Sequence, residues 1–403
     1  TGVTMPIAGV GTAAIVTGMQ FEESMSKVQA MTGATNEEIA GLEEMAKELG
    51  ETTRFSASEA ADAMAFLGMA GYDTNQILDS MPGLLDLAAA GQLELGRAAD
   101  ITTNVMAGFN IEAEHTQEVA DILAEAATSA NTSVEQMGSA MSYVAPVAES
   151  AGWSIQETAA AIGVLSDNGI QGERAGTALR SMIASLQNPV GATAEVIEEL
   201  GLSVEDVNPT MNSLSEILET LEEAGMDSSQ AIELVGQEAG PGLSVLLSKG
   251  SKGIEDFTEQ LENSEGAASR VASTMSDNTK GTMREFTSAL EGVGIAVSEH
   301  ILPPLTDLIK KGTDLVRKFG ELDEQTQKTI LVAGGLAAAV GPVALAVGGL
   351  FRGVGMLTGG LSKAMREIGR FTLRTKRAQA PIDNLSRSTG RVNENVGLVA
   401  HAF

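Results

Sequence analysis

One pattern recurs through the first half of the chain. A Ser or Thr is followed three residues later by an acidic residue, and an apolar stretch with helical spacing comes next. This is the capping-box pattern of a helix start, because the hydroxyl and the carboxylate each bond a backbone amide that the helix leaves free. Six pairs show it: Thr35/Glu38, Ser56/Glu59, Thr132/Glu135, Ser154/Glu157, Ser203/Asp206 and Ser213/Glu216. We therefore expect a helix to begin at each pair.

Apolar residues after these pairs recur every three to four positions, as at Ile39, Leu42, Met45 and Leu49. Glycines that could end the helices follow: Gly50, Gly71, Gly91, Gly152, Gly201 and Gly225. No stretch shows the alternation of a strand. The sequence predicts an all-α protein, with short stacked helical hairpins followed by longer helices and an apolar Gly/Ala-rich helical segment.

Two stretches of the chain resemble each other. G-E-R-A-G-T-A-L-R-S-M-I (172–183) aligns with G-Q-E-A-G-P-G-L-S-V-L-L (236–247), and L-G-R-A-A-D-I-T-T (95–103) is a fainter third copy. Repeats of this kind predict helical hairpins that stack on one another. The alternative is chance similarity between helices rich in Ala and Gly.

We divide the chain into five segments. They are an apolar lead-in and first helix (1–34), a body of repeated helical hairpins (35–247), an extended helical region (248–328), an apolar membrane-competent segment (329–360) and a basic amphipathic tail (361–403). Leu302-Pro303-Pro304-Leu305 is expected to break the extended region. Because the chain begins with Thr1 rather than Met, we expect a fragment or a processed form.

The charge is unevenly distributed. Residues 1–300 hold 11 Lys or Arg and 46 Asp or Glu, whereas residues 301–403 hold 14 and 8. An acidic body repels nucleic acid at long range, so we expect no specific nucleic-acid binding.

Residues that carry chemistry are sparse. The chain has no Cys, which excludes disulfides and a thiol nucleophile, and its three His lie far apart in the sequence. Neither a zinc motif nor a phosphate-binding loop occurs. Trp153 follows a Gly at a helix entry, where a packing role is favoured over sugar stacking. The sequence predicts no catalytic, cofactor-binding or metal-binding residue, and hence a protein that is not an enzyme and has no cofactor.

The stretch 329–351 is 23 residues long and carries no charge. As a helix it would be about 34 Å long, enough to cross a bilayer. Its composition is modestly hydrophobic, and small residues recur four apart, which lets helices approach closely. The residues assigned to this helix-packing or membrane segment are Gly334, Gly341, Pro342, Gly348, Gly349 and Gly353.

A basic face follows the apolar segment. On a helical wheel its members lie opposite an apolar face that includes Leu357 and Leu361. The basic residues are Lys363, Arg366, Arg370, Arg374 and Arg377. Such a helix suits an anionic membrane surface. The alternative is a surface helix that turns its basic face to an acidic partner, such as the body of this chain.

Five further stretches are informative through their order and spacing. They are F-E-E-S-M-S-K-V-Q-A-M-T-G-A (21–34), A-K-E-L-G-E-T-T-R-F-S-A-S-E-A-A-D-A-M (46–64), D-N-G-I-Q-G-E-R-A-G-T-A-L-R-S-M (167–182), I-L-P-P-L (301–305) and A-A-V-G-P-V-A-L-A-V-G-G-L (338–350). Together they resemble phage tail tape measure proteins of the type found in long, flexible tails of Gram-positive phages and related prophages.

This resemblance implies a mostly helical virion protein that sits in several copies in the lumen of the tail tube. Its length would set tail length during assembly, and at ejection it would assist DNA across the host envelope and meet the host membrane. The partners implied are further copies, tail tube and tail tip proteins, tail assembly chaperones and membrane lipid. The alternatives are a membrane-associated component of a cellular secretion or toxin-delivery system, and the helical body of a cell-wall hydrolase.

Overall fold

The computed structural model describes residues 4–327 and divides the chain into two compact units. One unit is Met19–Val293, and the other combines Thr1–Gly18 with Gly294–Phe403. Every regular element between residues 4 and 327 is helical, which confirms the predicted all-α class. α1 (Thr4–Thr32) and α15 (Thr279–Gly320) each contribute to both units.

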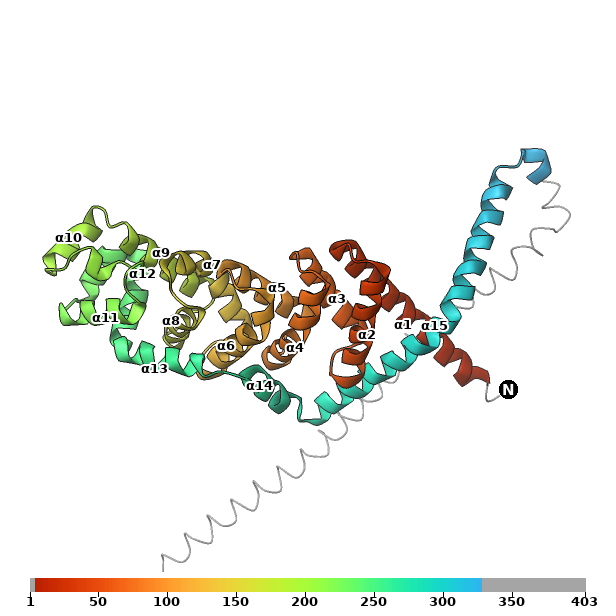
Figure 1. Cartoon of the computed structure of the whole chain (residues 1–403), viewed down its shortest axis with the longest axis horizontal. Coiled ribbons are helices and arrows are strands. Elements are labelled where there is room, and N and C mark those ends of the chain that lie inside the picture. Colours follow the sequence, from red (N-terminus) through yellow and green to blue (C-terminus); the bar gives the residue numbers. More distant parts are fainter. Residues whose placement is uncertain (1–3, 328–403) are drawn as a thin grey trace, which may run out of the picture. The chain divides into compact units, whose positions relative to one another are not determined.

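The larger unit is an array of helical hairpins that stack side by side in two rows (Figure 1). In one row each helix packs on the next: α3 (Ala57–Met69), α5 (Leu95–Gly108), α7 (Val134–Ala151), α9 (Glu173–Gln187) and α12 (Ser228–Lys249). The second row consists of α4 (Thr74–Gly91), α6 (Thr116–Ser129) and α8 (Ile155–Asp167). α2 (Asn36–Thr52) packs against α3 and α4 at one end.

The array has a regular period. α3, α5, α7 and α9 begin 38, 39 and 39 residues apart. Beyond α9, α10 (Ala192–Glu199) and α11 (Leu214–Glu223) come between α9 and α12 in sequence and interrupt the period. Two short 3₁₀ helices, η1 (Ala113–His115) and η2 (Glu205–Val207), complete the connections. Stacked hairpins of this length are typical of α-solenoids.

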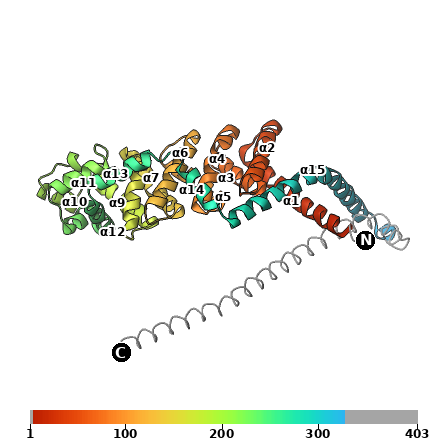
Figure 2. The ribbon, with the colours of Figure 1, turned by 90° about the horizontal axis from the view of Figure 1, so that it is seen from below.

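After α12 the chain turns back along the second row. α13 (Ser251–Glu262) packs on α8 and α11, and α14 (Ala267–Ser276) packs on α4 and α6 (Figures 1 and 2). The sparse apolar positions of these two helices therefore have their partner in the array itself.

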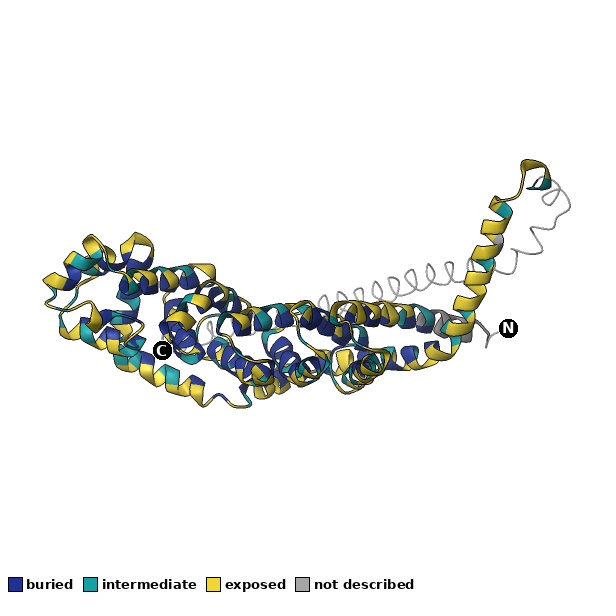
Figure 3. Ribbon diagram, turned by 45° about the horizontal axis from the view of Figure 1, so that its top comes forward, coloured by how far each residue is buried: buried dark blue, intermediate teal, exposed yellow. Residues whose placement is uncertain are grey.

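Small side chains let the helices of the array approach closely. Buried residues lie between the helices throughout the array (Figure 3), and most of them are Ala, Leu, Ile, Val or Met. Gly176 of α9 shows how tight the packing is, because a Cβ placed there would lie 2.2 Å from the carbonyl oxygen of Ala140 on α7. A core made of many close helix–helix contacts needs few aromatic residues.

The helix starts were partly predicted. Full capping boxes form at three of the six pairs, Thr35/Glu38, Ser56/Glu59 and Ser213/Glu216. Ser154 caps α8, but the Glu157 side chain does not return to it. Ser203/Asp206 lies at the start of the 3₁₀ helix η2, which contains Asp206, and not at the start of an α-helix. Boxes at Asp73/Gln76 and Asp227/Gln230 were not predicted, since they use an Asp cap with Gln.

The predicted start at Thr132/Glu135 was wrong by one residue. Ser133 is the N-cap of α7, and its hydroxyl accepts from the Gln136 amide at 3.2 Å. The reason lies outside the local pattern, because Asp167 holds the Asn131 amide at 2.7 Å and fixes the turn before the helix.

The glycines predicted to end helices do so in part. Four of the six have positive φ after a helix: Gly71, Gly152, Gly201 and Gly225. Gly50 and Gly91 are themselves helical. The two aligned stretches begin alike, since Gly172 precedes α9 with φ 57° and Gly236 interrupts α12 with φ 85°. Both positions thus start a new helix with a conformation that favours glycine.

The predicted break at Pro303-Pro304 was wrong, because both prolines lie inside α15. Each proline removes one helical hydrogen bond and crowds the carbonyl four residues earlier. Glu299, His300 and both prolines are exposed, so water can satisfy the carbonyl groups that this frees. In the same unit α15 lies close to α1, because a Cβ on Gly18 would be 1.9 Å from the Ser298 hydroxyl.

Candidate interaction surface

The residues assigned from the sequence to membrane contact lie outside the described part of the chain. This holds for the helix-packing set around Gly341 and Pro342 and for the basic face from Lys363 to Arg377. Both remain predictions. Among residues 4–327, no helix combines the length and apolar character needed to cross a membrane.

His115 and Trp153, which could carry chemistry, both have ordinary structural surroundings. His115 is exposed and contacts Glu118 at 3.1 Å, as expected for a solvated helix start. Trp153 is buried, and its indole N–H donates to the Asn212 carbonyl at 3.3 Å, which confirms the packing role. Over residues 4–327, no cluster of three acidic or His side chains is placed to hold a metal ion.

Two buried carboxylates connect helices of the array that lie far apart in the sequence. Asp121 on α6 is 3% exposed and accepts from the amides of Gly266 and Ala268, each at 2.9 Å. These amides lie at the start of α14, where helix N–H groups have no partner in their own helix. Asp121 therefore fastens α14 to the second row, and its negative charge suits the positive end of that helix.

Glu157 on α8 acts in the same way on α11. Its carboxylate accepts from the Leu214 amide at 2.6 Å, although Leu214 is 57 residues away in sequence. Burial raises the pKa of the Glu157 carboxyl, and hydrogen bonds from the backbone of Leu214 and Ser215 oppose that rise. This long-range cap explains why Ser154 and Glu157 do not form the predicted box.

The first part of α15 is held against the α2–α3 end of the array. The Ser288 hydroxyl is 4% exposed and lies 2.7 Å from the Gly50 carbonyl oxygen and 2.5 Å from that of Phe55. Three residues further on, Glu291 accepts from the Ser58 amide at 3.2 Å. These bonds fix which face of α15 points to the array.

The opposite face of this part of α15 is apolar and exposed. Met283, Phe286, Leu290 and Val293 are between 54% and 61% exposed. Their 3-4-3 spacing is that of a coiled-coil seam. We call these four residues the α15 stripe. An exposed apolar row on a helix whose other face is packed marks a contact surface.

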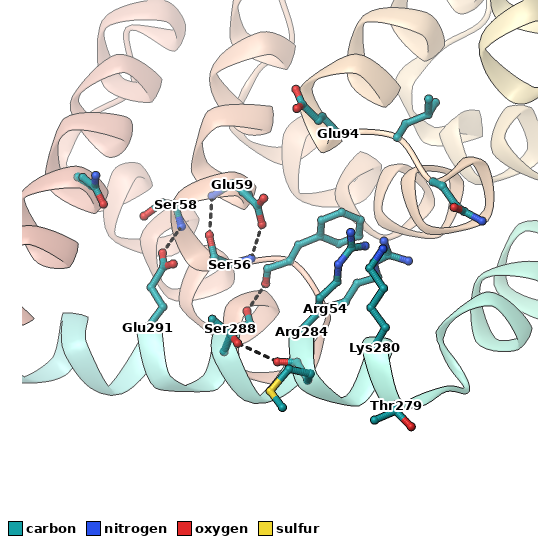
Figure 4. Close-up of a pocket in the computed structure, with 16 residues that line it drawn as sticks. Arg54, Ser56, Ser58, Glu59, Glu94, Thr279, Lys280, Arg284, Ser288 and Glu291 are labelled. Atoms are coloured by element: carbon teal, nitrogen blue, oxygen red, sulfur yellow. Dashed lines mark hydrogen bonds between the residues drawn. The ribbon is translucent and has the colours of Figure 1, made fainter. Parts of the chain in front are cut away.

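A cleft of about 1020 Å³ opens beside the stripe. Its walls are the α2–α3 turn, the α4–α5 turn and α15, and all its lining residues belong to the larger unit. Figure 4 shows Arg54, Lys280 and Arg284 together toward the Thr279 end of the cleft, with Glu291 at the other end. We call these three residues the cationic trio.

The acids of the cleft are largely engaged elsewhere. Glu59 accepts from the Ser56 amide at 2.8 Å in the capping box of α3, and Glu291 accepts from the Ser58 amide. Arg54 lies 5.3 Å from the centre of the Phe55 ring. Burial lowers the pKa of the Arg54 guanidinium, and the nearby charge of Arg284 lowers it further. The end of the cleft at the cationic trio presents positive charge, which suits carboxylate or phosphate oxygens.

The trio was not predicted, because its members lie far apart in the sequence. The sequence does show that cations are scarce, since Arg54, Lys280 and Arg284 are three of only 11 Lys or Arg in the first 300 residues. Lys280 and Arg284 also lie four apart, and therefore share a helix face.

Comparison with known proteins places the chain. A family model described as "Phage-related minor tail protein" matches residues 43–240. A tape measure protein of Pneumococcus phage Dp-1 is 37% identical over 351 residues, which is 86% of this chain and 30% of that protein. A probable tape measure protein of Escherichia phage P2 is 30% identical over 354 residues, which is 83% of this chain and 43% of that protein. The chain belongs to the phage tail tape measure proteins.

The matches map onto the fold in an informative way. The family model begins within α2 and ends within α12, so for this tape measure protein it covers the hairpin array. The chain spans less than half of the length of the two curated relatives. No solved structure matches it.

Proposed function

We propose that this chain is the hairpin-array part of a tape measure protein that sets tail length during assembly and assists DNA passage at ejection. It acts as a structural component and not as an enzyme. The observation that most strongly supports this proposal is the similarity to two tape measure proteins over more than four fifths of the chain. In this proposal the chain resides in the tail tube lumen and reaches the host membrane after ejection.

The array limits how such a chain could measure length. Packed helices lie about 8–10 Å apart, so one hairpin advances the array by roughly that amount. The same 39 residues would extend about 58 Å as a continuous helix at 1.5 Å per residue. Residues in the array thus contribute little length, and most of the ruler belongs to the rest of the protein.

Deletion in the complete protein tests this proposal. Removing one period, residues 95–133, should shorten tails by no more than about 10 Å. Removing 39 residues from a continuous helical part outside the array should shorten them by about 58 Å. Tail lengths measured by electron microscopy that stay constant across a series of deletions outside the array would refute the ruler function.

We further propose that copies of the chain associate through the α15 stripe. Residues 279–293 carry two Lys or Arg and two Asp or Glu, so this segment is neutral within a strongly acidic unit. Thr287 and Ala289, which flank the stripe, are small and uncharged. Two copies would repel each other least here, and small flanking residues allow their helices to approach.

Sedimentation velocity tests the association. The chain should form oligomers that Phe286→Glu and Leu290→Glu disrupt. Met211→Glu is a matched control, because Met211 is 66% exposed but lies away from α15 on the α11 side of the array. A chain that stays monomeric at high concentration contradicts the proposal, and so does equal disruption by the control. Tail tube, tail tip and chaperone proteins remain proposed partners on the strength of the family alone.

Membrane contact after ejection is proposed on the apolar 329–360 segment and the basic face that follows it. The full chain should release dye from anionic vesicles, and neutralising Arg366, Arg370 and Arg374 together should reduce the release. Equal release from neutral vesicles would show that the basic face does not direct binding.

A further inference from the structure

The cationic trio stands out because three cations gather at one end of a single cleft in an acidic unit. Some cations of the larger unit pair with carboxylates, as in Lys47–Glu43 at 2.7 Å and Lys27–Glu23 at 3.3 Å. Within residues 4–327, no ion pair or hydrogen bond engages the charged side-chain groups of Arg54, Lys280 or Arg284. Acids outnumber cations roughly four to one in this unit, so three cations side by side on one cleft are the feature that needs a reason.

The fold brings these charges together and keeps them there. Arg54 sits in the α2–α3 turn, whose Phe55 carbonyl is bonded to Ser288 on α15. Arg284 and Lys280 lie about one and two turns before Ser288 on the same helix. The clamp that positions α15 therefore also holds like charges on both sides of one cleft, which disfavours the empty state and favours an anion between them.

We propose that the cationic trio binds carboxylate groups on an acidic helix of a partner protein. Arginine forks match carboxylates in two-point contacts. Lys280 and Arg284 are four residues apart, so they match two acids spaced three or four apart on a facing helix. Met283 is exposed between them and lines the cleft, which gives an apolar residue of the partner helix a contact.

Other occupants fit less well. A nucleic-acid backbone would continue past the trio and meet Glu94 and Glu291 in the same cleft. The tail of this chain is excluded by charge, because residues 361–403 hold eight Lys or Arg against three Asp or Glu. A short acidic helix needs only the cationic end of the cleft. This inference goes beyond the proposed function and does not depend on it.

The test uses the whole chain and a fluorescein-labelled decaglutamate peptide at low ionic strength, followed by fluorescence anisotropy. The double variant Arg54→Gln/Arg284→Gln should bind at least about tenfold more weakly, since hydrogen bonds to charged groups contribute about 1.5–3 kcal/mol each. Arg180→Gln is the control, because Arg180 is exposed on α9 away from the cleft. Its affinity should equal that of the unaltered chain.

Stability gives a second readout that a merely structural role would not produce. If the trio is held for a ligand, Arg284→Gln should raise the melting temperature of the free chain, because it removes repulsion from Arg54. The proposal is overturned if the unaltered chain does not bind decaglutamate, or if the double variant and the control bind alike. It is also overturned if a ten-nucleotide single-stranded DNA binds as tightly and shows the same dependence on Arg54 and Arg284.

Discussion

Asp121 offers the most direct test of how the returning helices are attached. Replacing it with Ala removes the acceptor of two backbone amides, those of Gly266 and Ala268, both at 2.9 Å. The Ala268 bond is buried, and the carboxylate itself is 3% exposed. Water therefore cannot replace the acceptor of the Ala268 amide without opening the contact between α6 and α14, and the half-buried Gly266 amide is shielded in part.

The cost can be worked out from these two amides. A donor left without a partner in a buried site costs about 1–3 kcal/mol, so Asp121→Ala should destabilise the protein by about 2–4 kcal/mol. Asp121→Asn keeps one amide oxygen as an acceptor and should cost about half as much. A change of this size is a large part of the 5–15 kcal/mol that typically stabilises a domain.

Urea unfolding measures the total effect, and amide hydrogen exchange shows where it falls. Protection should be lost first at Gly266 and Ala268, because α14 detaches before the array unfolds. Glu125→Ala is the control, since Glu125 lies one turn along α6 and bonds the exposed Gln260 side chain at 2.7 Å. It should change stability by no more than about 0.5 kcal/mol. An Asp121→Ala cost below that value would refute the reasoning.

Three further perturbations follow from the packing. Burial raises the folded pKa of Glu157, so the unaltered protein should lose stability as pH rises from the unfolded pKa through the raised folded pKa, and Glu157→Gln should escape that loss. The stability of the variant relative to the unaltered protein should therefore rise over this interval and level off above it, and a pH-independent difference in urea midpoint would contradict this. Gly176→Ala should lower stability by about 1–3 kcal/mol, because its Cβ meets the Ala140 carbonyl oxygen and α7 must shift; an unchanged melting temperature would show that the helices separate freely. Trp153→Ala should cost about 3–5 kcal/mol in the same assay as a buried aromatic, and a loss under 1 kcal/mol would mean that the site collapses.

The sequence predicted those features that depend on neighbouring residues. A hydroxyl cap and an acid three positions later are bonded through one turn of backbone, so Thr35/Glu38 and Ser56/Glu59 form their boxes as expected. The all-α class follows from the same local regularity. The repeat was found only in fragments: Leu95 and Gly172 are 77 residues apart, which is two periods of the array.

Features that join distant parts of the chain could not be predicted. Ser154/Glu157 has the same local pattern as the true boxes, yet its acid reaches Leu214 on another hairpin. Asp121 looks like any acid on an amphipathic helix until α14 comes into contact with it. A local pattern specifies that an acid is present, whereas the tertiary fold decides which helix end it caps.

The many acidic side chains of this chain have a structural role as well as an effect on its surface charge. Each helix in a stacked array exposes an N-terminus with unpartnered amides, and short helices multiply those ends. Asp and Glu satisfy them locally, as at Thr35/Glu38, or across hairpins, as Asp121 and Glu157 do. Cations have no comparable task at these ends. Where three of them gather without a paired carboxylate, as at Arg54, Lys280 and Arg284, binding of an acidic partner explains why they lie together.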